Sequence, residues 1–423
     1  MRRQRQPPFR AMKPPQSIRP LELQHYPFSY QRSRVSARIV AALIQPMNRS
    51  GDPASPHVAE PRRVCLVGLI GGGHSGVPRY AAALTRAIDR VSSDYPGLTV
   101  TLLTTAAGAE AIHTRSIPVE VVAGKSRWVN AGPGRLALEQ AVVRRHDQDL
   151  FHYFDVTGPL FSRRRFTATI HDTAFVYGYA PRSSTYKRWL YPWALRRARA
   201  AIAVSQFAKD EAVRHFAADP AKISVVHSGP GLRASGDVAA SIAADGPPFL
   251  LYVGNLGGNK NLPFLVRCFD QAASPARLAL VGRARGDTSE LRAAIDGAAS
   301  RAKIDLVGDV SDEELERLYR SAKALLLPSV YEGFGFTALE AMARGCPVLA
   351  SDIPALREVA GSGALLLPLE DENAWTAAMM RIVSDEQARA DLRSRGATTV
   401  ERYSWERTAR GVLDVLAREA SRL

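Results

Sequence analysis

One stretch of the sequence decides the fold, and it reads Pro328-Ser329-Val330-Tyr331-Glu332-Gly333-Phe334-Gly335-Phe336-Thr337-Ala338-Leu339-Glu340-Ala341-Met342. The apolar run before it, Ala324 to Leu327, predicts a buried strand, and the residues after the glycines predict a helix. Gly333 and Gly335 let the backbone approach a ligand closely, and the start of a helix attracts an anion. Glu332 and Glu340 place one carboxylate on each side of this turn. That arrangement suits a nucleotide-sugar, because hydroxyl groups lie on both sides of its diphosphate.

A purely structural interpretation accounts for part of the same stretch. Thr337 and Glu340 have the spacing of a capping box, with Thr337 as N-cap and Glu340 as the third helical residue. A capping box would explain Glu340 without any ligand. The stretch by itself therefore leaves both interpretations open.

The residues that follow extend the pattern through Ala343-Arg344-Gly345-Cys346-Pro347-Val348-Leu349-Ala350-Ser351 and Leu356-Arg357-Glu358-Val359-Ala360-Gly361. The whole pattern resembles the signature of retaining glycosyltransferases of the GT-B type, especially family 4, in which seven residues separate two glutamates. The resemblance covers roughly residues 62 to 410. It implies an α/β fold of the GT-B type, with two doubly wound Rossmann-like domains that face each other across a cleft.

Short apolar runs alternate with helical stretches along most of the chain, which is typical of parallel sheets covered by helices. The predicted strands are Val64–Val67, Leu98–Leu103, Val119–Val122, Leu150–Phe154, Phe166–Ile170, Ala200–Val204, Ile223–Val226, Phe249–Val253, Leu278–Val281, Ile304–Val307, Ala324–Leu327, Val348–Ala350 and Ala364–Leu367. The segment from Gly231 to Pro248 interrupts the alternation and predicts a linker. We therefore expect two domains, residues 62–237 and 238–423, and the resemblance implies that the first binds the acceptor and the second the nucleotide-sugar. The resemblance implies that the last helix, around Trp405 to Arg422, crosses back to the first domain.

The net charge of +15 is concentrated at the N-terminus. Residues 1–63 hold twelve Lys or Arg and three Asp or Glu, which gives +9. Because residues 1–61 are also rich in proline and lack periodicity, they predict a disordered basic extension, although Met47 could instead begin the protein. Such a tail attracts anionic lipid or nucleic acid without specificity. We expect a membrane surface, since the inferred substrate is lipid-borne, and no specific nucleic acid.

Two further features concern the compartment. Cys65, Cys268 and Cys346 are far apart and predict buried thiols in a reducing compartment, hence the cytoplasm or the inner face of its membrane. The stretch from Lys187 to Arg197 mixes basic and aromatic residues and could rest on a membrane surface. The alternative is that its tryptophans belong to the core.

Two loops of the first domain are candidates for substrate binding. The first predicted strand leads into a glycine-rich loop with Gly72, Gly73, Ser75 and Gly76, which would let a phosphate or sugar approach closely. The alternative is a flexible turn. His171 follows another predicted strand, where a histidine is either structural or, as the resemblance implies, near the transferred sugar.

The second domain begins with Tyr252-Val253-Gly254-Asn255-Leu256-Gly257-Gly258-Asn259-Lys260-Asn261-Leu262. Family 4 members usually have arginine where this chain has Asn259, whereas Lys260 and Asn261 fit the family pattern. Lys260 would then be the main cation for the diphosphate, and Arg283 or Arg285 would replace the missing arginine. Without the resemblance, Lys260 could equally be an exposed surface lysine.

The resemblance implies a role for each residue of the predicted site. Glu332 would hold hydroxyls of the donor hexose, Glu340 the ribose, and His171 the reacting sugar, while Lys260 and backbone N–H groups would hold the phosphates. His171, Lys260 and Glu332 are the predicted catalytic residues. The predicted donor-binding residues are Asn255, Lys260, Val310, Glu332, Gly333, Phe334, Gly335, Phe336 and Glu340.

The sequence therefore predicts a retaining hexosyltransferase of surface polysaccharide biosynthesis. GDP-mannose is the expected donor, a glycan or lipid-linked saccharide the expected acceptor, and no metal or other cofactor is required. Two alternatives stay open: a nucleotide-sugar epimerase or hydrolase on the same fold, and a nucleic-acid-binding protein that acts through the basic tail.

Overall fold

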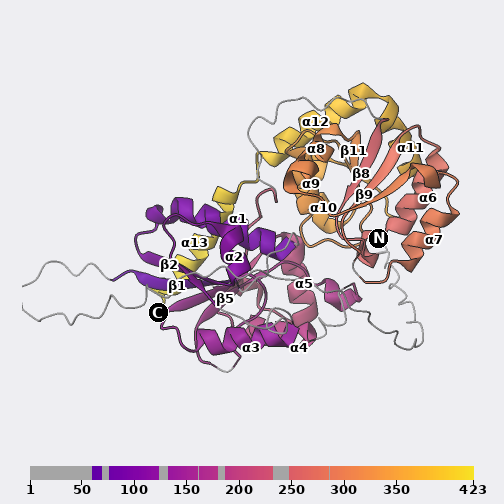
Figure 1. Ribbon diagram of the computed structural model, residues 1–423. Helices are drawn as coiled ribbons and strands as arrows, with labels where there is room; N and C mark the ends of the chain where they lie inside the picture. The colour runs from indigo at the N-terminus through magenta and orange to yellow at the C-terminus, as the bar shows by residue number, and fades with distance from the viewer. Residues whose placement is uncertain are drawn as a thin grey trace, which may run out of the picture. The chain divides into compact units, whose positions relative to one another are not determined.

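The computed structural model describes residues 60–68, 76–122, 132–160, 162–179, 186–231, 247–284 and 286–423 (Figure 1). The predicted extension at residues 1–61 lies almost wholly outside these ranges, as do Gly72, Gly73, Ser75 and Arg285. The predicted domain boundary between residues 237 and 238 also falls on residues that are not described. These points stay predictions.

The first half of the described chain forms a seven-stranded parallel sheet in the order β3-β2-β1-β4-β5-β6-β7. Its strands are β1 (Arg62–Gly68), β2 (Leu98–Thr104), β3 (Val119–Val121), β4 (Leu150–Tyr153), β5 (Phe166–Ile170), β6 (Ala200–Ala203) and β7 (Ile223–Val225). The direction of strand addition reverses between β1 and β4. In doubly wound sheets, ligands bind at the carboxyl ends of the strands beside such a reversal.

The second half forms a six-stranded parallel sheet in the order β10-β9-β8-β11-β12-β13, which reverses between β8 and β11. Its strands are β8 (Phe249–Val253), β9 (Arg277–Val281), β10 (Ile304–Gly308), β11 (Ala324–Leu327), β12 (Val348–Ser351) and β13 (Leu365–Leu367). Every strand predicted from the sequence is confirmed, with ends that differ by at most two residues. The two doubly wound sheets are confirmed as well.

Helices connect the strands. They are α1 (Gly76–Val91), α2 (Ala106–Ile112), α3 (Gly132–Val143), α4 (Lys187–Arg197), α5 (Gln206–Phe216), α6 (Leu262–Ala272), α7 (Ser289–Gly297), α8 (Asp312–Ser321), α9 (Phe336–Met342), α10 (Pro354–Val359), α11 (Glu372–Ser384), α12 (Glu386–Val400) and α13 (Trp405–Ser421). Among the described residues, no helix is both long enough and apolar enough to cross a membrane.

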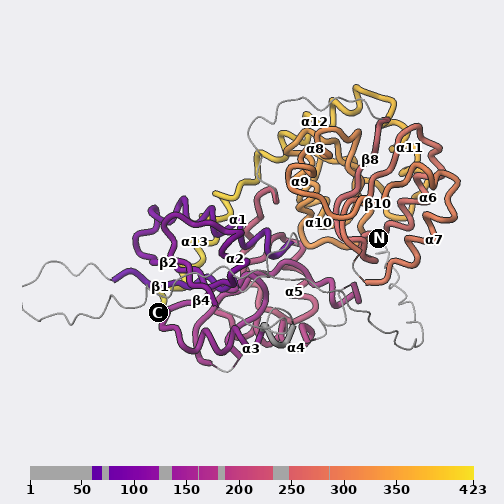
Figure 2. The backbone as a smooth tube through the Cα atoms, in the orientation of Figure 1, coloured from indigo at the N-terminus to yellow at the C-terminus, as the bar shows by residue number. Residues whose placement is uncertain are grey.

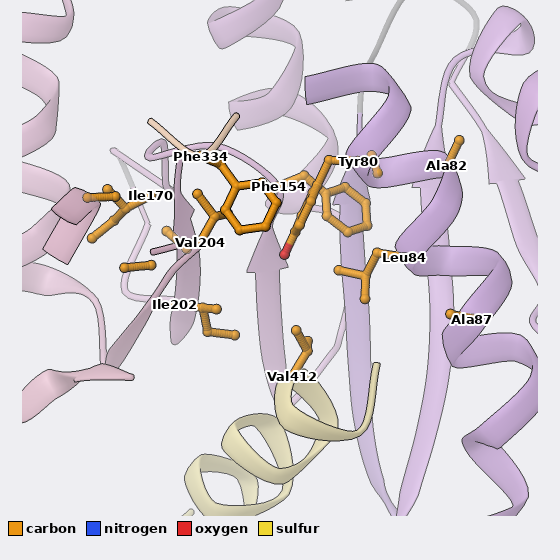
Figure 3. Packing of buried hydrophobic residues seen from close by; sticks show 14 of the residues in the cluster. Tyr80, Ala82, Leu84, Ala87, Phe154, Ile170, Ile202, Val204, Phe334 and Val412 are labelled. Carbon is orange, nitrogen blue, oxygen red and sulfur yellow. The ribbon is translucent and has the colours of Figure 1, made fainter. Parts of the chain in front are cut away.

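The inner strands of both sheets are buried on both faces, as their largely apolar sequences predict. β4, β5, β6, β11 and β12 are buried at every position. Figure 3 shows the core around Tyr80 of α1, where the rings of Phe154 and Phe334 gather with Val412 of α13. Cys65, Cys268 and Cys346 are buried free thiols, as predicted.

The last helix returns to the first sheet, as the resemblance implied. α13 packs against α1, β1, β4 and β6, and the yellow end of the chain lies beside the indigo α1 in Figure 2. Polar contacts fix its position: Trp405 Nε1 donates to Pro230 O at 2.6 Å, and Tyr95 donates its hydroxyl to Asp414 Oδ1 at 2.8 Å. Residues at both ends of the chain therefore share one core.

Candidate active site

Lys260 and Glu332 form an ion pair at the reversal of the second sheet. Lys260 ends the short 3₁₀ helix η6 (Gly258–Lys260) that follows β8, and Glu332 lies in the loop after β11. Because β8 and β11 are neighbours, the two loops meet, and Lys260 Nζ lies 2.5 Å from Glu332 Oε1. Each side chain is only 14% exposed, so Lys260 is not a surface lysine. Ser329 Oγ donates to the same carboxylate oxygen at 2.7 Å.

Two asparagines hold the Lys260 loop in place. Asn259 Nδ2 donates to Tyr331 O at 3.1 Å, and Val330 N donates to Asn259 O at 2.9 Å. Asn255 accepts a bond from Gly257 N at 3.1 Å within its own loop. Where the family usually has arginine, Asn259 thus joins the two loops instead of adding positive charge.

Arg283 is one of the two predicted substitutes for the arginine that the family usually has at position 259. It pairs with Asp309, and its side chain is 77% exposed. Val310, the predicted neighbour of the nucleobase, follows Asp309 and is half-buried. Among the residues that the structure describes, Lys260 is the cation paired with Glu332, and a contribution of Arg283 or Arg285 stays a prediction.

The glycine turn contacts the first sheet directly. A Cβ atom added to Gly333 would lie 2.0 Å from the carbonyl oxygen of His171, so only glycine fits there. Ser205 Oγ donates to Gly333 O at 2.6 Å. The predicted residues Glu332, Gly333 and His171 are thus brought together from positions far apart in the sequence.

His171 is buried at the carboxyl end of β5. Its Nε2–H donates to Phe154 O at 2.7 Å, and the edge of its ring meets Tyr80 at a centroid distance of 4.6 Å. Burial lowers the pKa of His171, while Asp155, the bond to Phe154 and Asp172 oppose this shift. The neutral imidazole is therefore the favoured form, with Nδ1 as its acceptor atom.

Glu340 is buried inside the second half of the chain rather than placed at a helix cap. Gly335, at φ +100°, is the N-cap of α9, and Thr337 makes no capping bond. The capping-box interpretation is therefore wrong, because the left-handed glycine starts the helix two residues earlier. Tyr319 donates its hydroxyl to Glu340 Oε2 at 2.9 Å, and Arg79 Nη1 lies 3.5 Å from Oε1. Burial raises the pKa of Glu340, although Arg79 and Tyr319 oppose the shift.

The other predicted site residues are mostly part of the framework. Phe334 is buried in the core, and the ring of Phe336 stacks on Trp405 at 6.3 Å. Their backbone N–H groups, rather than their side chains, are the groups predicted to face phosphate. Gly76 is the first residue of α1 and has no atom within 4 Å of an added Cβ.

Comparisons with known proteins agree with this geometry. The family "Glycosyltransferase Family 4" matches residues 74–230, and "Glycosyl transferases group 1" matches residues 237–399. The O-antigen chain mannosyltransferase RfbU of Salmonella typhimurium is 30% identical over 57% of this chain and 67% of its own length. The chain belongs to the family 4 glycosyltransferases.

Other relatives of this family 4 glycosyltransferase match over a smaller share of their length. The O-antigen chain mannosyltransferase B of Escherichia coli is 29% identical over 50% of this chain and 58% of its own length. A D-inositol 3-phosphate glycosyltransferase of Rhodococcus opacus is 31% identical over 48% of this chain. The match covers 50% of the length of the Rhodococcus opacus protein, so the chain spans about half of that relative.

Solved structures confirm the GT-B fold. HepE of Anabaena, solved in complex with UDP-glucose, has a TM-score of 0.65 at 19% identity and covers 84% of this chain and 99% of its own. The glycosyltransferase WaaG of lipopolysaccharide biosynthesis has a TM-score of 0.62 at 15% identity, over 83% of this chain and 99% of its own. At these identities the match shows the fold alone.

The sequence analysis gave no role to Glu358, a residue of this glycosyltransferase that joins the two sheets. Its carboxylate, on α10, accepts bonds from Gln206 N at 2.6 Å, Phe207 N at 3.0 Å and His227 Nε2 at 2.7 Å. These bonds lower the pKa of Glu358 although partial burial opposes the shift. The sequence around Glu358 gives no sign of this role, because its partners lie more than 130 residues away along the chain.

A cavity of about 590 Å³ lies away from these residues, beside the start of α11. It is lined by Gln271, Pro368, Glu370, Asp371, Glu372 and Asn373. None of the predicted site residues lines it, and its three acids would repel a diphosphate. The chemistry of Lys260, Glu332 and His171 identifies the site better than the size of this cavity does.

Proposed function

We propose that this chain is a retaining glycosyltransferase that moves a hexose, with mannose as the first candidate, from a nucleotide diphosphate donor to a hydroxyl of a glycan or lipid-linked saccharide. The process would be surface polysaccharide biosynthesis. Two relatives named as O-antigen chain mannosyltransferases support this choice of sugar and process.

One observation carries the proposal. A lysine and a glutamate meet at the carboxyl ends of β8 and β11, and the next residue, Gly333, touches the backbone of His171. The site thus combines a cation for phosphate, a carboxylate for sugar hydroxyls and a neutral imidazole. Enzymes that stabilise developing negative charge use such preorganised groups.

Each residue then has a defined task. Lys260 and the N–H groups of residues 333–336 bind the diphosphate, and Glu332 exchanges part of its contact with Lys260 for hydroxyls of the hexose. The bond from the anomeric carbon to the diphosphate breaks as the acceptor oxygen attacks on the same face. The acceptor proton passes to the departing diphosphate, so no protein nucleophile is required. Positioning supplies most of the rate enhancement.

A thermal-shift experiment tests the donor. The full-length protein is mixed with UDP, GDP, ADP or CMP, and we expect GDP to raise Tm most. The relatives favour GDP-mannose, whereas HepE, a neighbour in fold, was solved with UDP-glucose. Stabilisation by none of the four nucleotides would refute the proposal. The anomeric configuration of the product, read by NMR, tests retention.

An epimerase or hydrolase on the same fold is the main alternative. It would release a free sugar or an epimer without any acceptor. Incubation with donor and no acceptor separates the two, because a transferase releases nucleotide slowly until an acceptor hydroxyl is added. Fast release that no acceptor accelerates would favour the alternative.

We also propose that the protein works at the cytoplasmic face of a membrane. Trp189 on α4 is 83% exposed, and Arg188, Arg196 and Arg197 of the same helix are exposed as well. The expectation that both tryptophans of α4 are core residues is wrong for Trp189, while Trp193 stacks on Phe166 at 6.3 Å. Sedimentation with vesicles of phosphatidylglycerol should fall for Trp189→Ala. Equal sedimentation of this variant would contradict a membrane role for α4.

A further inference from the structure

A second lysine–carboxylate pair lies on the first sheet. Lys187 is the first residue of α4, and its Nζ lies 2.9 Å from Asp155 Oδ2. Tyr191 donates its hydroxyl to Asp155 Oδ1 at 3.2 Å, and Val156 N donates to the same atom at 2.8 Å. Asp155 is thus held in one orientation from three directions.

This pair lies next to His171. Asp155 directly follows Phe154, whose carbonyl oxygen accepts the Nε2–H of His171 at 2.7 Å. β4 and β5, which these residues follow, are neighbours in the sheet. Tyr191 Oη lies 3.2 Å from Asp155 Oδ1 and 3.4 Å from Asp172 O, so the pair and the loop of His171 share one region.

Lys187 keeps bonding capacity for a ligand. An ammonium group has three N–H donors, and within the part of the chain that the structure describes, one hydrogen bond uses them. The Lys187 side chain is 22% exposed and that of Asp155 is 11% exposed. An ordered ammonium beside an ordered carboxylate can bind two neighbouring hydroxyls of a sugar, one as acceptor and one as donor.

The charges around His171 decide which kind of acceptor fits. Three charged side chains lie near it: Asp172 directly follows His171, Asp155 directly follows Phe154, and Lys187 pairs with Asp155. With His171 neutral, their sum is one negative charge, which repels a phosphate and tolerates a neutral sugar.

We propose that Asp155 and Lys187 form the acceptor subsite, and that it takes an uncharged sugar through hydroxyl groups rather than a phosphorylated polyol. This inference rests on the proposed transferase function and adds the class of acceptor. It distinguishes this chain from a relative named as a D-inositol 3-phosphate glycosyltransferase.

The test compares D-mannose with D-mannose 6-phosphate as acceptors for the full-length protein, with GDP-mannose or the donor that the thermal-shift experiment identifies. Nucleotide release is measured with each acceptor and without one. We expect the wild type to have a kcat/KM about tenfold higher for mannose. Lys187→Gln should raise the acceptor KM about tenfold and leave the donor KM unchanged.

Asp155→Asn should change the preference between the two acceptors. It removes one negative charge, so the preference for mannose over mannose 6-phosphate should shrink several-fold. Lys222→Gln is the matched control, because Lys222 is an exposed lysine of the same half whose Nζ contacts Arg196 O at 3.4 Å. If a single variant fails to fold, the double variant Asp155→Asn/Lys187→Gln, which keeps the net charge of −1 because Asp172 remains, should show the raised acceptor KM and keep the preference for mannose.

Two results would overturn the subsite: a wild type that prefers mannose 6-phosphate, or a Lys187→Gln variant with an unchanged acceptor KM. Each of them still leaves a wild type that binds and cleaves the donor. A wild type that does not bind the donor at all would instead refute the proposed function.

Discussion

Lys260 Nζ lies 2.5 Å from Glu332 Oε1, and both side chains are largely buried. The pair joins loops that are 72 residues apart. A partly buried charge that loses its partner destabilises the site, because the remaining charge is poorly solvated. Glu332 also keeps its bond from Ser329 Oγ at 2.7 Å, which fixes it when Lys260 turns to a ligand.

Lys260→Ala should lower turnover about tenfold or more without unfolding the protein, because one charge-assisted bond to phosphate is worth roughly 1.5–3 kcal/mol. Donor affinity by calorimetry and initial rates measure the effect. Lys303→Ala is the control, since Lys303 in the same half donates to Ser274 O, at 2.8 Å, and is not a predicted site residue. A fully active Lys260→Ala enzyme would reject the phosphate role.

Gly333→Ala should abolish most activity, because its Cβ would lie 2.0 Å from His171 O and the turn would have to move. A displacement of about 1 Å at a reacting centre costs about a hundredfold in rate. Gly297→Ala, where no atom lies within 4 Å of the added Cβ, should leave the rate unchanged. Wild-type kcat in Gly333→Ala would show that the turn does not position the donor.

Glu340→Gln keeps the shape of the side chain and an acceptor for Tyr319, so it should fold like the wild type while nucleotide Kd rises about tenfold. Glu340→Ala leaves the buried hydroxyl of Tyr319 without its 2.9 Å partner and should lower the free energy of unfolding by about 1–3 kcal/mol. Urea denaturation and nucleotide titration separate the two effects. An unchanged nucleotide Kd in Glu340→Gln would leave Glu340 a structural residue.

Glu358→Ala removes the carboxylate that accepts the first N–H groups of α5 at 2.6 and 3.0 Å. Loss of such a helix cap costs about 0.5–2 kcal/mol, and we expect a decrease of that size in the free energy of unfolding. The exposed Glu401→Ala serves as control. If both variants unfold at the same urea concentration, Glu358 does not stabilise the contact between the halves.

His152 should make the protein less stable in mild acid. It is buried between Thr167 Oγ1 at 2.9 Å and Thr169 Oγ1 at 3.2 Å, and burial lowers its pKa to about 3. Between the unfolded pKa of about 6.5 and this value, the unfolded chain binds a proton that the folded protein does not. Stability from this group is therefore complete above pH ~6.5 and falls as the pH decreases towards 3, by on the order of 5 kcal/mol in total.

The His152→Asn variant tests whether His152 causes this loss of stability in acid. Free energies of unfolding measured between pH 4 and 7 should vary less steeply in this variant than in the wild type. His113→Asn is the control, because His113 is exposed and its φ of 47° is one that asparagine also adopts. Identical slopes in the wild type and His152→Asn would assign the acid sensitivity to other groups.

The strands were predictable because a strand buried on both faces is largely apolar, as Ala324–Leu327 and Phe249–Val253 are. The start of α9 was not predictable, because Thr337 and Gly335 can each serve as the N-cap of a helix. The closeness of Gly335 to Leu356 is not visible in the sequence. The burial of Lys260 was equally hidden, because a lysine in a polar loop looks the same whether or not a carboxylate from another loop covers it.

By itself, the sequence determined the strands of two parallel sheets, the glycine turn after β11 and the family. Each of these depends on short motifs whose residues are close together in the chain. Only the tertiary structure decided the partners of the polar side chains: Lys260 with Glu332, Ser205 with Gly333, Glu358 with the start of α5, and Lys187 with Asp155. The physical reason is that buried charges and hydroxyls must be satisfied by whatever packing brings near. In this fold those groups come from loops 32 to 152 residues apart.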